Sequence, residues 1–297
     1  MQFFLEVLIG GLLSGVMYSL VALGYVMIYK SSGVFNFAQG AMVFMAAASV
    51  VGFHAYGVPF AIAVLLAMGV MVVFAFATER FMLRKLVNQP EITLFMATIG
   101  LTFFVEGLTQ LVWGTDVRKL ELGIPDEPVP WVMDSTGLLV SSFDIVAALV
   151  AAGLIILLAL FFAFTKVGRA LRAVADDHEA AQSIGIPLPF VCGVVWSVSG
   201  FVALVAGMMW GARNGVQFSL VFVALKALPV LILGGFTSVP GVIVGGLLIG
   251  ASEKLAEVYI GPFVGGGIEG WFPYMLALTI LLVRPEGLFG EKIIRRI

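Results

Sequence analysis

The stretch from Lys166 to Pro187, KVGRALRAVADDHEAAQSIGIP, is a polar segment between two long apolar runs. It carries six charged residues and one histidine in a chain that is only 11% charged. Crossing a bilayer as a helix takes about 20 apolar residues, and the runs on both sides are long enough. The stretch is therefore expected as a polar helix carried between two membrane spans, and this contrast decides the fold.

The composition supports the same fold class. The chain has 297 residues, of which 61% are hydrophobic, whereas soluble domains are about 45–50% apolar and about 25% charged. We therefore predict an all-α polytopic membrane protein, with residues 1–297 forming a single transmembrane domain. The net charge of −2 gives no basic footprint for nucleic acid.

Nine apolar segments are candidate membrane spans, and three of them are short. The short ones, 38–56, 218–235 and 271–283, are candidates for re-entrant or broken helices. We therefore expect about eight to nine transmembrane helices. The full set is 5–29, 38–56, 58–78, 92–113, 143–165, 190–211, 218–235, 239–259 and 271–283.

Basic residues orient the chain. They gather in the loops 79–91 and 166–187 and in the tail after residue 291, so the positive-inside rule places all three in the cytoplasm. The loop 114–142 is more acidic and is expected outside. An odd number of crossings puts the N-terminus outside, whereas one re-entrant segment moves it inside. The sequence leaves both arrangements open.

The segment 166–187 has two interpretations. It is either a solvated loop helix or a docking element for a soluble partner. Arg169 and Arg172 lie one turn apart, and the small residues after Glu179 would let another protein approach closely. Gly185 followed by Pro187 is a typical helix stop.

Two stretches bring polar groups and glycines into apolar surroundings. The first runs from Ser31 to Gly40, and the second runs from Arg213 to Gly241. Paired Gly- or Pro-interrupted segments in the two halves of a chain point to a transport pathway. The alternative is two ordinary polar turns at the membrane surface. Residues expected to line or gate a pathway are Asn36, Gln39, Gly40, Gly234, Gly235 and Gly241.

Ionisable residues inside the predicted spans are few. Glu106 lies past the middle of 92–113, where it either faces a polar cavity or partners Thr102 or Gln110 on the same helix face. Lys226 lies within a short apolar run. Glu253 belongs to a charged group that ends the span 239–259, and this group is expected at the outer interface.

No catalytic or metal site is predicted. The chain lacks G-x-x-x-x-G-K-[ST], G-x-S-x-G, H-E-x-x-H and C-x-x-C motifs, and its two histidines lie far apart. We therefore expect no catalytic residue and no cofactor bound by this chain. Any active transport must draw on an ion gradient or on another chain, and the docking interpretation of 166–187 favours another chain.

Four blocks of the sequence, in order, resemble one family. They are GLLSGVMYSLVALGYVMIYKSSGVFNFAQG at 11–40, RALRAVADDHEAAQSIGI at 169–186, KALPVLILGGFTSVPGVIVGGLLIG at 226–250 and LVRPEGLFG at 282–290. The chain resembles, over nearly its full length, the LivH-type permease subunits of ATP-binding-cassette importers for branched-chain amino acids.

The resemblance implies a multi-pass permease of the bacterial inner membrane. It implies a second homologous permease, forming a heterodimer or a homodimer, two cytoplasmic ATPases that hold ATP and Mg²⁺, a periplasmic solute-binding protein, and surrounding membrane lipid. The block 169–186 looks like the loop with which such permeases contact the ATPase. Residues assigned to this contact are Arg172, Glu179, Ala180, Ala181 and Gly185.

The resemblance leaves the solute class open. It implies branched-chain or other small neutral amino acids, with urea, short amides or aromatic acids as alternatives within the family. Gln39 stands where the branched-chain members often have histidine. Outside the family, the rival is an ion-coupled secondary transporter that works alone and uses Glu106. A channel would leave the segment 166–187 unexplained, and a membrane enzyme would need a catalytic set that the sequence lacks.

Overall fold

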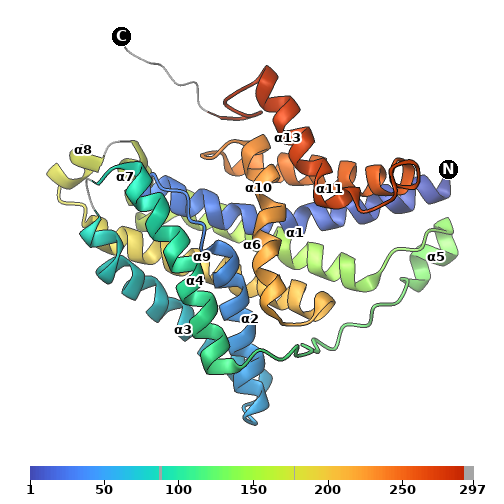
Figure 1. The fold of residues 1–297 in the computed structure, drawn as a ribbon, viewed down its shortest axis with the longest axis horizontal. Coiled ribbons are helices and arrows are strands. Elements are labelled where there is room, and N and C mark those ends of the chain that lie inside the picture. Colours follow the sequence, from blue (N-terminus) through green and yellow to red (C-terminus); the bar gives the residue numbers. More distant parts are fainter. Residues whose placement is uncertain (87–88, 177, 291–297) are drawn as a thin grey trace. The chain divides into compact units, whose positions relative to one another are not determined.

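The computed structural model describes residues 1–86, 89–176 and 178–290, with the backbone alone for Glu91, Asp176, His178 and Glu179. The described residues are helical and contain no strand, only isolated bridges. The elements are α1 (Gln2–Ser32), α2 (Gln39–Ala55), α3 (Phe60–Phe81), η1 (Leu83–Lys85), α4 (Glu91–Trp113), α5 (Pro130–Thr136), α6 (Ser142–Phe164), α7 (Lys166–Asp176), α8 (His178–Ser183), α9 (Leu188–Asn214), η2 (Phe218–Phe222), α10 (Val223–Gly234), α11 (Val239–Tyr259), α12 (Gly261–Val264), η3 (Ile268–Gly270) and α13 (Phe272–Val283) (Figure 1).

The prediction of an all-α polytopic membrane protein is confirmed. Within the described residues, six helices are long and apolar enough to cross a membrane, and three shorter apolar helices accompany them. All nine predicted segments appear as helices, with ends shifted by a few residues. The segment 218–235 is divided into η2 and α10, and the short helix α5 in the loop 114–142 was not predicted.

The chain forms two compact units. Unit 1 comprises residues 1–22, 121–155 and 225–297, and unit 2 comprises residues 23–120 and 156–224. Helices α1 and α6 each contribute residues to both units. Neither unit is continuous in sequence. Each is therefore built from segments that are distant from one another along the chain.

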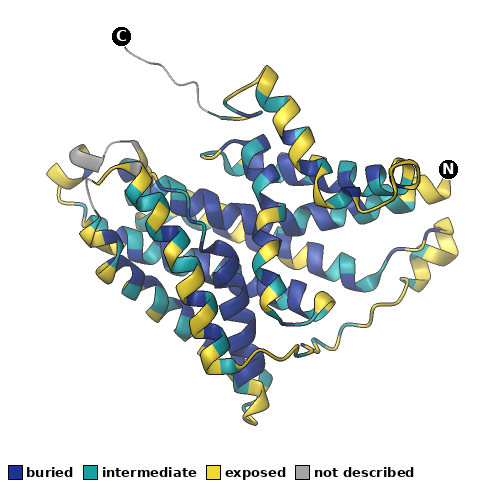
Figure 2. Cartoon of the chain, viewed as in Figure 1, coloured by how far each residue is buried: buried dark blue, intermediate teal, exposed yellow. Residues whose placement is uncertain are grey.

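Helix α2 is the centre of unit 2. It packs against α3, α4, α9 and η2, and it is buried along most of its length (Figure 2). A helix that is apolar on every side is typically an interior helix. Close packing depends on small residues, because a Cβ at Gly207 of α9 would lie 2.6 Å from the carbonyl oxygen of Val43.

Unit 1 is held by glycine contacts between the first part of α1 and α11. A Cβ at Gly11 would lie 2.6 Å from the carbonyl oxygen of Gly250, and Gly15 and Gly246 face each other in the same way. Ser19 adds a hydrogen bond from its hydroxyl to the carbonyl oxygen of Val242, at 3.0 Å. The two backbones can approach this closely only because neither helix carries side chains at the crossing.

Candidate functional site

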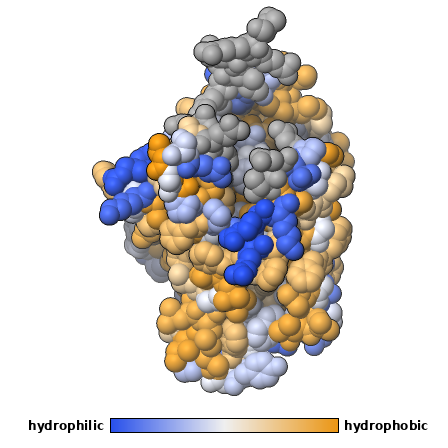
Figure 3. Space-filling view, turned by 90° about the vertical axis from the view of Figure 1, so that its left-hand side faces the viewer, coloured by the Kyte–Doolittle hydropathy of each residue, from blue (hydrophilic) through white to orange (hydrophobic). Residues whose placement is uncertain are grey.

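The polar segment expected between two spans is present as two helices, α7 and α8, rather than one, and residue 177 lies outside the described residues. Thr165 forms the bend after α6, where its hydroxyl accepts a hydrogen bond from the Gly168 amide at 3.1 Å. Figure 3 views the side that carries α7 and α8, and it shows hydrophilic side chains gathered in the upper half above a mainly hydrophobic surface.

Arg172 joins α7 to the end of α6. Its guanidinium donates hydrogen bonds to the carbonyl oxygens of Phe162 at 3.1 Å and Ala163 at 3.4 Å. The last carbonyl groups of a helix lack partners within the helix, and a basic side chain there also suits the helix dipole. Gly168 lies directly against the carbonyl oxygen of Phe162, so a side chain at this position would clash. The junction between α6 and α7 is therefore a fixed elbow.

The two helices bury one side and expose the other. Leu171 and Val174 of α7 and Ala181 of α8 are buried, at 3%, 0% and 2% exposure. Ala180 and Gly185 are exposed. Gly185 has φ +84° and ends the helix as predicted. Ala181 therefore packs within this chain, and its assignment to a partner contact stays a prediction.

The exposed tip of this segment carries one large apolar side chain. Ile184 is 74% exposed, immediately before the Gly185 turn. The side chain of Glu179, which was assigned to the same contact, lies outside the described residues. The segment therefore presents small residues and one isoleucine on a helix tip that is anchored to the membrane helices.

The first interrupted stretch lies inside unit 2. Gly33 ends α1 with φ +66°. Asn36 and Gln39 are 1% and 0% exposed. Asn36 accepts a hydrogen bond from the Ala38 amide at 3.1 Å, and Gln39 is 2.9 Å from the hydroxyl of Ser199. The break predicted in this stretch is thus confirmed, and both amides lie in the core of the unit.

Gly40 serves packing rather than the break itself. It lies in the first turn of α2, after the interruption. A Cβ there would clash with the carbonyl oxygen of Val221 and lie 2.9 Å from the side chain of Ala224. Glycine at this position lets the end of the second interrupted stretch rest on α2. The assignment of Asn36, Gln39 and Gly40 to a pathway stays a prediction.

The second interrupted stretch continues in unit 1 as a tight turn between α10 and α11. A Cβ at Gly234 would lie 2.5 Å from the carbonyl carbon of Gly241. Gly235 has φ +98°, and the Ser238 hydroxyl caps α11 by accepting a hydrogen bond from the Gly241 amide at 3.0 Å. Their gating role likewise stays a prediction.

The closing block LVRPEGLFG folds onto this turn. The Leu288 amide donates a hydrogen bond to the carbonyl oxygen of Leu233 at 2.8 Å, and a Cβ at Gly235 would lie 2.8 Å from the amide nitrogen of Gly290. Two sequence blocks that resemble the family therefore form one structural feature.

Glu106 has a partner on its own helix. Its carboxylate accepts a hydrogen bond from the Gln110 side chain at 3.4 Å. Thr102, the other partner considered, donates instead to the carbonyl oxygen of Thr98 at 2.9 Å. Glu106 is thus one partner of a local pair on α4.

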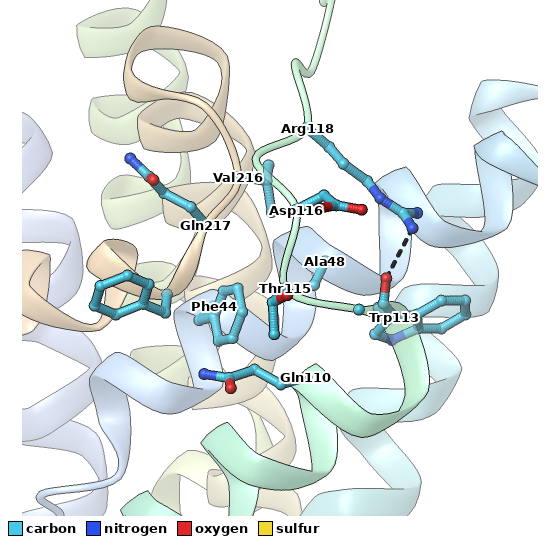
Figure 4. Close-up of a pocket in the computed structure, with 11 residues that line it drawn as sticks. Phe44, Ala48, Gln110, Trp113, Thr115, Asp116, Arg118, Val216 and Gln217 are labelled. Atoms are coloured by element: carbon cyan, nitrogen blue, oxygen red, sulfur yellow. Dashed lines mark hydrogen bonds between the residues drawn. The ribbon is translucent and has the colours of Figure 1, made fainter.

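A small pocket lies at the predicted outer end of unit 2 (Figure 4). Its volume is about 60 Å³, which holds a few water molecules, since one occupies about 30 Å³ in the liquid. The lining combines aromatic and polar side chains. The residues are Phe44, Ala48, Gln110, Trp113, Gly114, Thr115, Asp116, Arg118, Val216, Gln217 and Phe218.

Backbone pairing builds this pocket. Arg118 and Val216 exchange two backbone hydrogen bonds, at 3.1 and 2.7 Å, and so tie the loop after α4 to the loop after α9. The Arg118 guanidinium also donates to the carbonyl oxygen of Trp113 at 2.8 Å (Figure 4). This pocket was not predicted from the sequence, because it forms where two loops distant in the sequence meet.

The third polar site is a charge cluster in unit 1. The Lys226 ammonium lies 3.3 Å from Oε1 of Glu253 and 3.7 Å from Oε1 of Glu269. Lys254 pairs with Oε2 of Glu269 at 3.4 Å. The Tyr18 hydroxyl donates to Oε1 of Glu253 at 3.2 Å. The cluster therefore connects α1, α10, α11 and η3.

Glu253 is buried within unit 1, with a residue exposure of only 1%. Its expected position at the outer interface stays a prediction. Lys226 was noted in an apolar run, and a charged residue within a membrane segment needs a partner. The sequence shows both residues but not their pairing, because they are 27 residues apart and the turn between α10 and α11 separates them.

Comparison with known proteins identifies relatives over the full chain. A family model described as "Branched-chain amino acid transport system / permease component" matches residues 7–283. The permease protein LivH of the high-affinity branched-chain amino acid transport system of Escherichia coli K12 is 26% identical, covering 99% of this chain and 98% of that protein. BraD of Pseudomonas aeruginosa, a permease protein of a system with the same description, is 27% identical, again covering 99% and 98%.

A relative of lower sequence identity is named for a different solute. The fructose import permease protein FruF of Bifidobacterium longum is 22% identical, covering 80% of this chain and 66% of that protein. The family model spans nearly the whole chain, and the described residues supply helices suited to crossing a membrane. The chain is therefore a multi-pass membrane protein that belongs to the family of permease components of branched-chain amino acid transport systems.

Proposed function

We propose that this chain is a permease subunit of an ATP-binding-cassette importer for branched-chain amino acids. The observation that carries the proposal is the geometry of the segment 166–187. Its two helices pack against the rest of unit 2 through Leu171 and Val174 and through the Arg172 hydrogen bonds. The end of the segment, at Ile184, is exposed. A solvated loop helix does not need the fixed junction that the Arg172 contacts form with α6.

The proposal assigns the energy source to partner chains. Two cytoplasmic ATPases would bind ATP and Mg²⁺ and receive the tip of the segment 166–187, while this chain would carry no catalytic residue. A second homologous permease would complete the membrane part, as a heterodimer or a homodimer. A periplasmic binding protein would deliver the solute, and the assembly would reside in the bacterial inner membrane.

The fixed junction between α6 and α7 suggests how a movement of the ATPases reaches the membrane helices. When the ATPases close, they move α7 and α8 as one body. The Arg172 guanidinium is hydrogen-bonded to carbonyl oxygens in the last turn of α6. A movement of α7 would therefore move α6 as well, instead of only bending the chain at Thr165. The membrane helices then re-pack between two discrete arrangements, which is the usual form of a switching transition.

Branched-chain amino acids are the solutes that the relatives favour. LivH and BraD belong by name to branched-chain amino acid systems, and both cover almost the whole chain. FruF is named for fructose but covers less of the chain. Urea, short amides and aromatic acids remain the alternatives within the family, and the ion-coupled transporter is less favoured because Glu106 already has Gln110 as a partner.

One experiment tests the docking and the transport together. The tagged chain is purified from its native membrane in mild detergent, and the co-purifying proteins are identified. Ile184→Asp is compared with Met133→Asp, which alters a 45% exposed apolar residue on the opposite, predicted outer side. We expect Ile184→Asp to lose the ATPase and at least 10-fold of L-leucine uptake at normal abundance, and Met133→Asp to retain both.

Two outcomes would contradict the proposal. A wild-type chain that purifies without any ATPase in several detergents would favour a secondary transporter. An Ile184→Asp variant that keeps both its ATPase and its L-leucine uptake would remove the docking role of the segment 166–187.

A further inference from the structure

The charge cluster joins two candidate membrane spans, α1 and α11, to shorter elements that do not cross the bilayer by themselves. Helices α10 and α13 have 12 residues each, which is about 18 Å of helix against a hydrocarbon core of about 30 Å. Lys226 is the fourth residue of α10, and Glu253 is six residues from the end of α11. At 1.5 Å per residue, Glu253 lies about 9 Å inside that end.

Three charged side chains of the cluster are partly exposed, so lipid cannot be what covers them. The side chains of Lys226, Lys254 and Glu269 are 34%, 38% and 41% exposed. A charged side chain facing hydrocarbon costs several kcal/mol, so intramembrane charges face protein or a water-filled cavity. This face of unit 1 is therefore not a lipid-facing surface.

The cluster also holds one oxygen without a partner. Oε1 of Glu253 receives both the Tyr18 hydroxyl and the Lys226 ammonium. Oε2 of the same carboxylate is buried and has no hydrogen-bond partner among the described residues. Buried polar atoms are normally satisfied, and a carboxylate oxygen is a strong acceptor. The site thus has an unused acceptor.

The charges in the cluster are balanced. Among the ion-paired groups, Lys226 and Lys254 offset Glu253 and Glu269, so the site offers both a cation for a carboxylate and anions for an ammonium group. Leu225, next to Lys226, is 42% exposed and offers apolar contact. The Tyr274 hydroxyl donates to the carbonyl oxygen of Leu225 at 2.7 Å and holds the start of α13 beside this position.

We infer that Lys226, Glu253 and Glu269 form a recognition site for the carboxylate and ammonium groups of a zwitterionic amino acid. The inference deepens the proposed function and rests on it. The solute carboxylate pairs with Lys226, and the solute ammonium pairs with the two glutamates. In the structure described, Lys226 occupies both glutamates itself, so solute binding exchanges one set of ion pairs for another.

Lys226 lies closer to Glu253 than to Glu269, and this difference makes the exchange of ion pairs feasible. Its contact with Glu269, at 3.7 Å, is longer than its contact with Glu253, at 3.3 Å. Partly exposed ion pairs contribute at most about 1 kcal/mol, so breaking the Glu269 contact costs little. A solute side chain would then lie against apolar residues such as Leu225, while its two charged groups replace the contacts that are lost.

The test measures solute binding to the purified permease–ATPase complex without the binding protein. The probe is radiolabelled L-leucine, with two competitors that each lack one charge: 4-methylpentanoate has no ammonium group, and 3-methylbutylamine has no carboxylate. We expect each competitor to bind at least 10-fold more weakly than L-leucine. Lys226→Gln should weaken L-leucine at least 10-fold and leave 3-methylbutylamine unchanged, whereas Glu253→Gln should weaken L-leucine and leave 4-methylpentanoate unchanged.

The matched control is Glu79→Gln, which alters a buried glutamate of unit 2 that pairs with Arg84. Lys226→Arg and Glu253→Asp, which keep the charges, cover the case in which a neutral variant fails to fold. We expect them to retain the preference for L-leucine over both competitors.

Two results separate the inference from the proposed function. If the complete wild-type importer takes up L-leucine but the Lys226 and Glu253 variants keep the wild-type preference among the three ligands, the inference is wrong and the proposed function stands. If the complete wild-type importer takes up no branched-chain amino acid, the proposed function fails and the inference fails with it.

Discussion

Two buried glutamates, one in each unit, are paired with basic residues in different ways. Glu79 in unit 2 binds Arg84 through both oxygens, at 3.1 and 3.0 Å. Glu253 in unit 1 binds Lys226 through Oε1 at 3.3 Å, and its Oε2 has no partner among the described residues. The first carboxylate is fully satisfied and the second is half satisfied.

The two pairs also differ in what they connect. Glu79 and Arg84 are five residues apart and close the turn after α3. A planar guanidinium that binds a carboxylate by two parallel hydrogen bonds fixes one geometry. Lys226 is a flexible point charge shared by α11 and η3. The difference teaches that a buried glutamate alone does not indicate function, and the unfilled acceptor beside a shared lysine is what our inference adds for Glu253.

The largest effect is expected from Arg84→Met. This change leaves the buried carboxylate of Glu79, 5% exposed, without its partner. Removing one member of a fully buried ion pair typically costs about 3–5 kcal/mol, and the 52% exposure of the Arg84 side chain places this pair below that range. Thermal unfolding of the purified chain in detergent should therefore show a lowered midpoint, while L-leucine uptake per folded molecule stays near wild type. A large loss of uptake at unchanged stability would break the comparison.

Lys226→Met is expected to affect function more than folding. Glu253 keeps its hydrogen bond from Tyr18, and Glu269 keeps Lys254. We expect a stability loss smaller than that of Arg84→Met, and a loss of L-leucine binding of at least 10-fold, about 1.4 kcal/mol. Unfolding and binding are measured on the same preparation. If both variants lose stability equally and Lys226→Met still binds L-leucine normally, the two pairs are equivalent.

The fold was largely predictable from hydropathy, for a physical reason. Backbone groups within a bilayer must be satisfied internally, so an apolar segment of sufficient length has to be a helix. The segment 5–29 became α1, and 143–165 became α6, each within three residues of the predicted ends. The break before α2 was visible because Gly33, Asn36 and Gln39 interrupt an apolar run.

The site was less predictable, because its contacts join residues that are distant in sequence. The pairing of Lys226 with Glu253 depends on how the turn at Gly234–Gly241 returns the chain. The resemblance assigned Arg172 to a partner contact, which stays a prediction, but it did not indicate that its guanidinium binds carbonyl groups of α6. Hydropathy specifies which segments are helices, but it does not specify which helix faces meet.

A smaller effect is expected from Tyr18→Phe. The hydroxyl of Tyr18 is 3.2 Å from Oε1 of Glu253. Removing one hydrogen bond to a buried charged group costs about 1.5–3 kcal/mol when the acceptor is left unsatisfied. Lys226 still binds the same oxygen, so we expect a loss of about 1 kcal/mol, the central value for a typical hydrogen bond. Chemical denaturation checks the stability, and an effect as large as that of Arg84→Met would show that Tyr18 rather than Lys226 is the principal partner.

The smallest effect is expected from Lys254→Gln. Lys254 and Glu269 are 38% and 41% exposed, and they lie 3.4 Å apart. Ion pairs of this kind contribute about 0–1 kcal/mol and are screened by salt. L-leucine affinity should change less than threefold, and the change should shrink as the ionic strength rises, because Lys226 remains to bind the solute carboxylate. If Lys254→Gln weakens L-leucine as much as Lys226→Met does, the solute carboxylate is held by both lysines, and the boundary of the site must be moved outward to include Lys254.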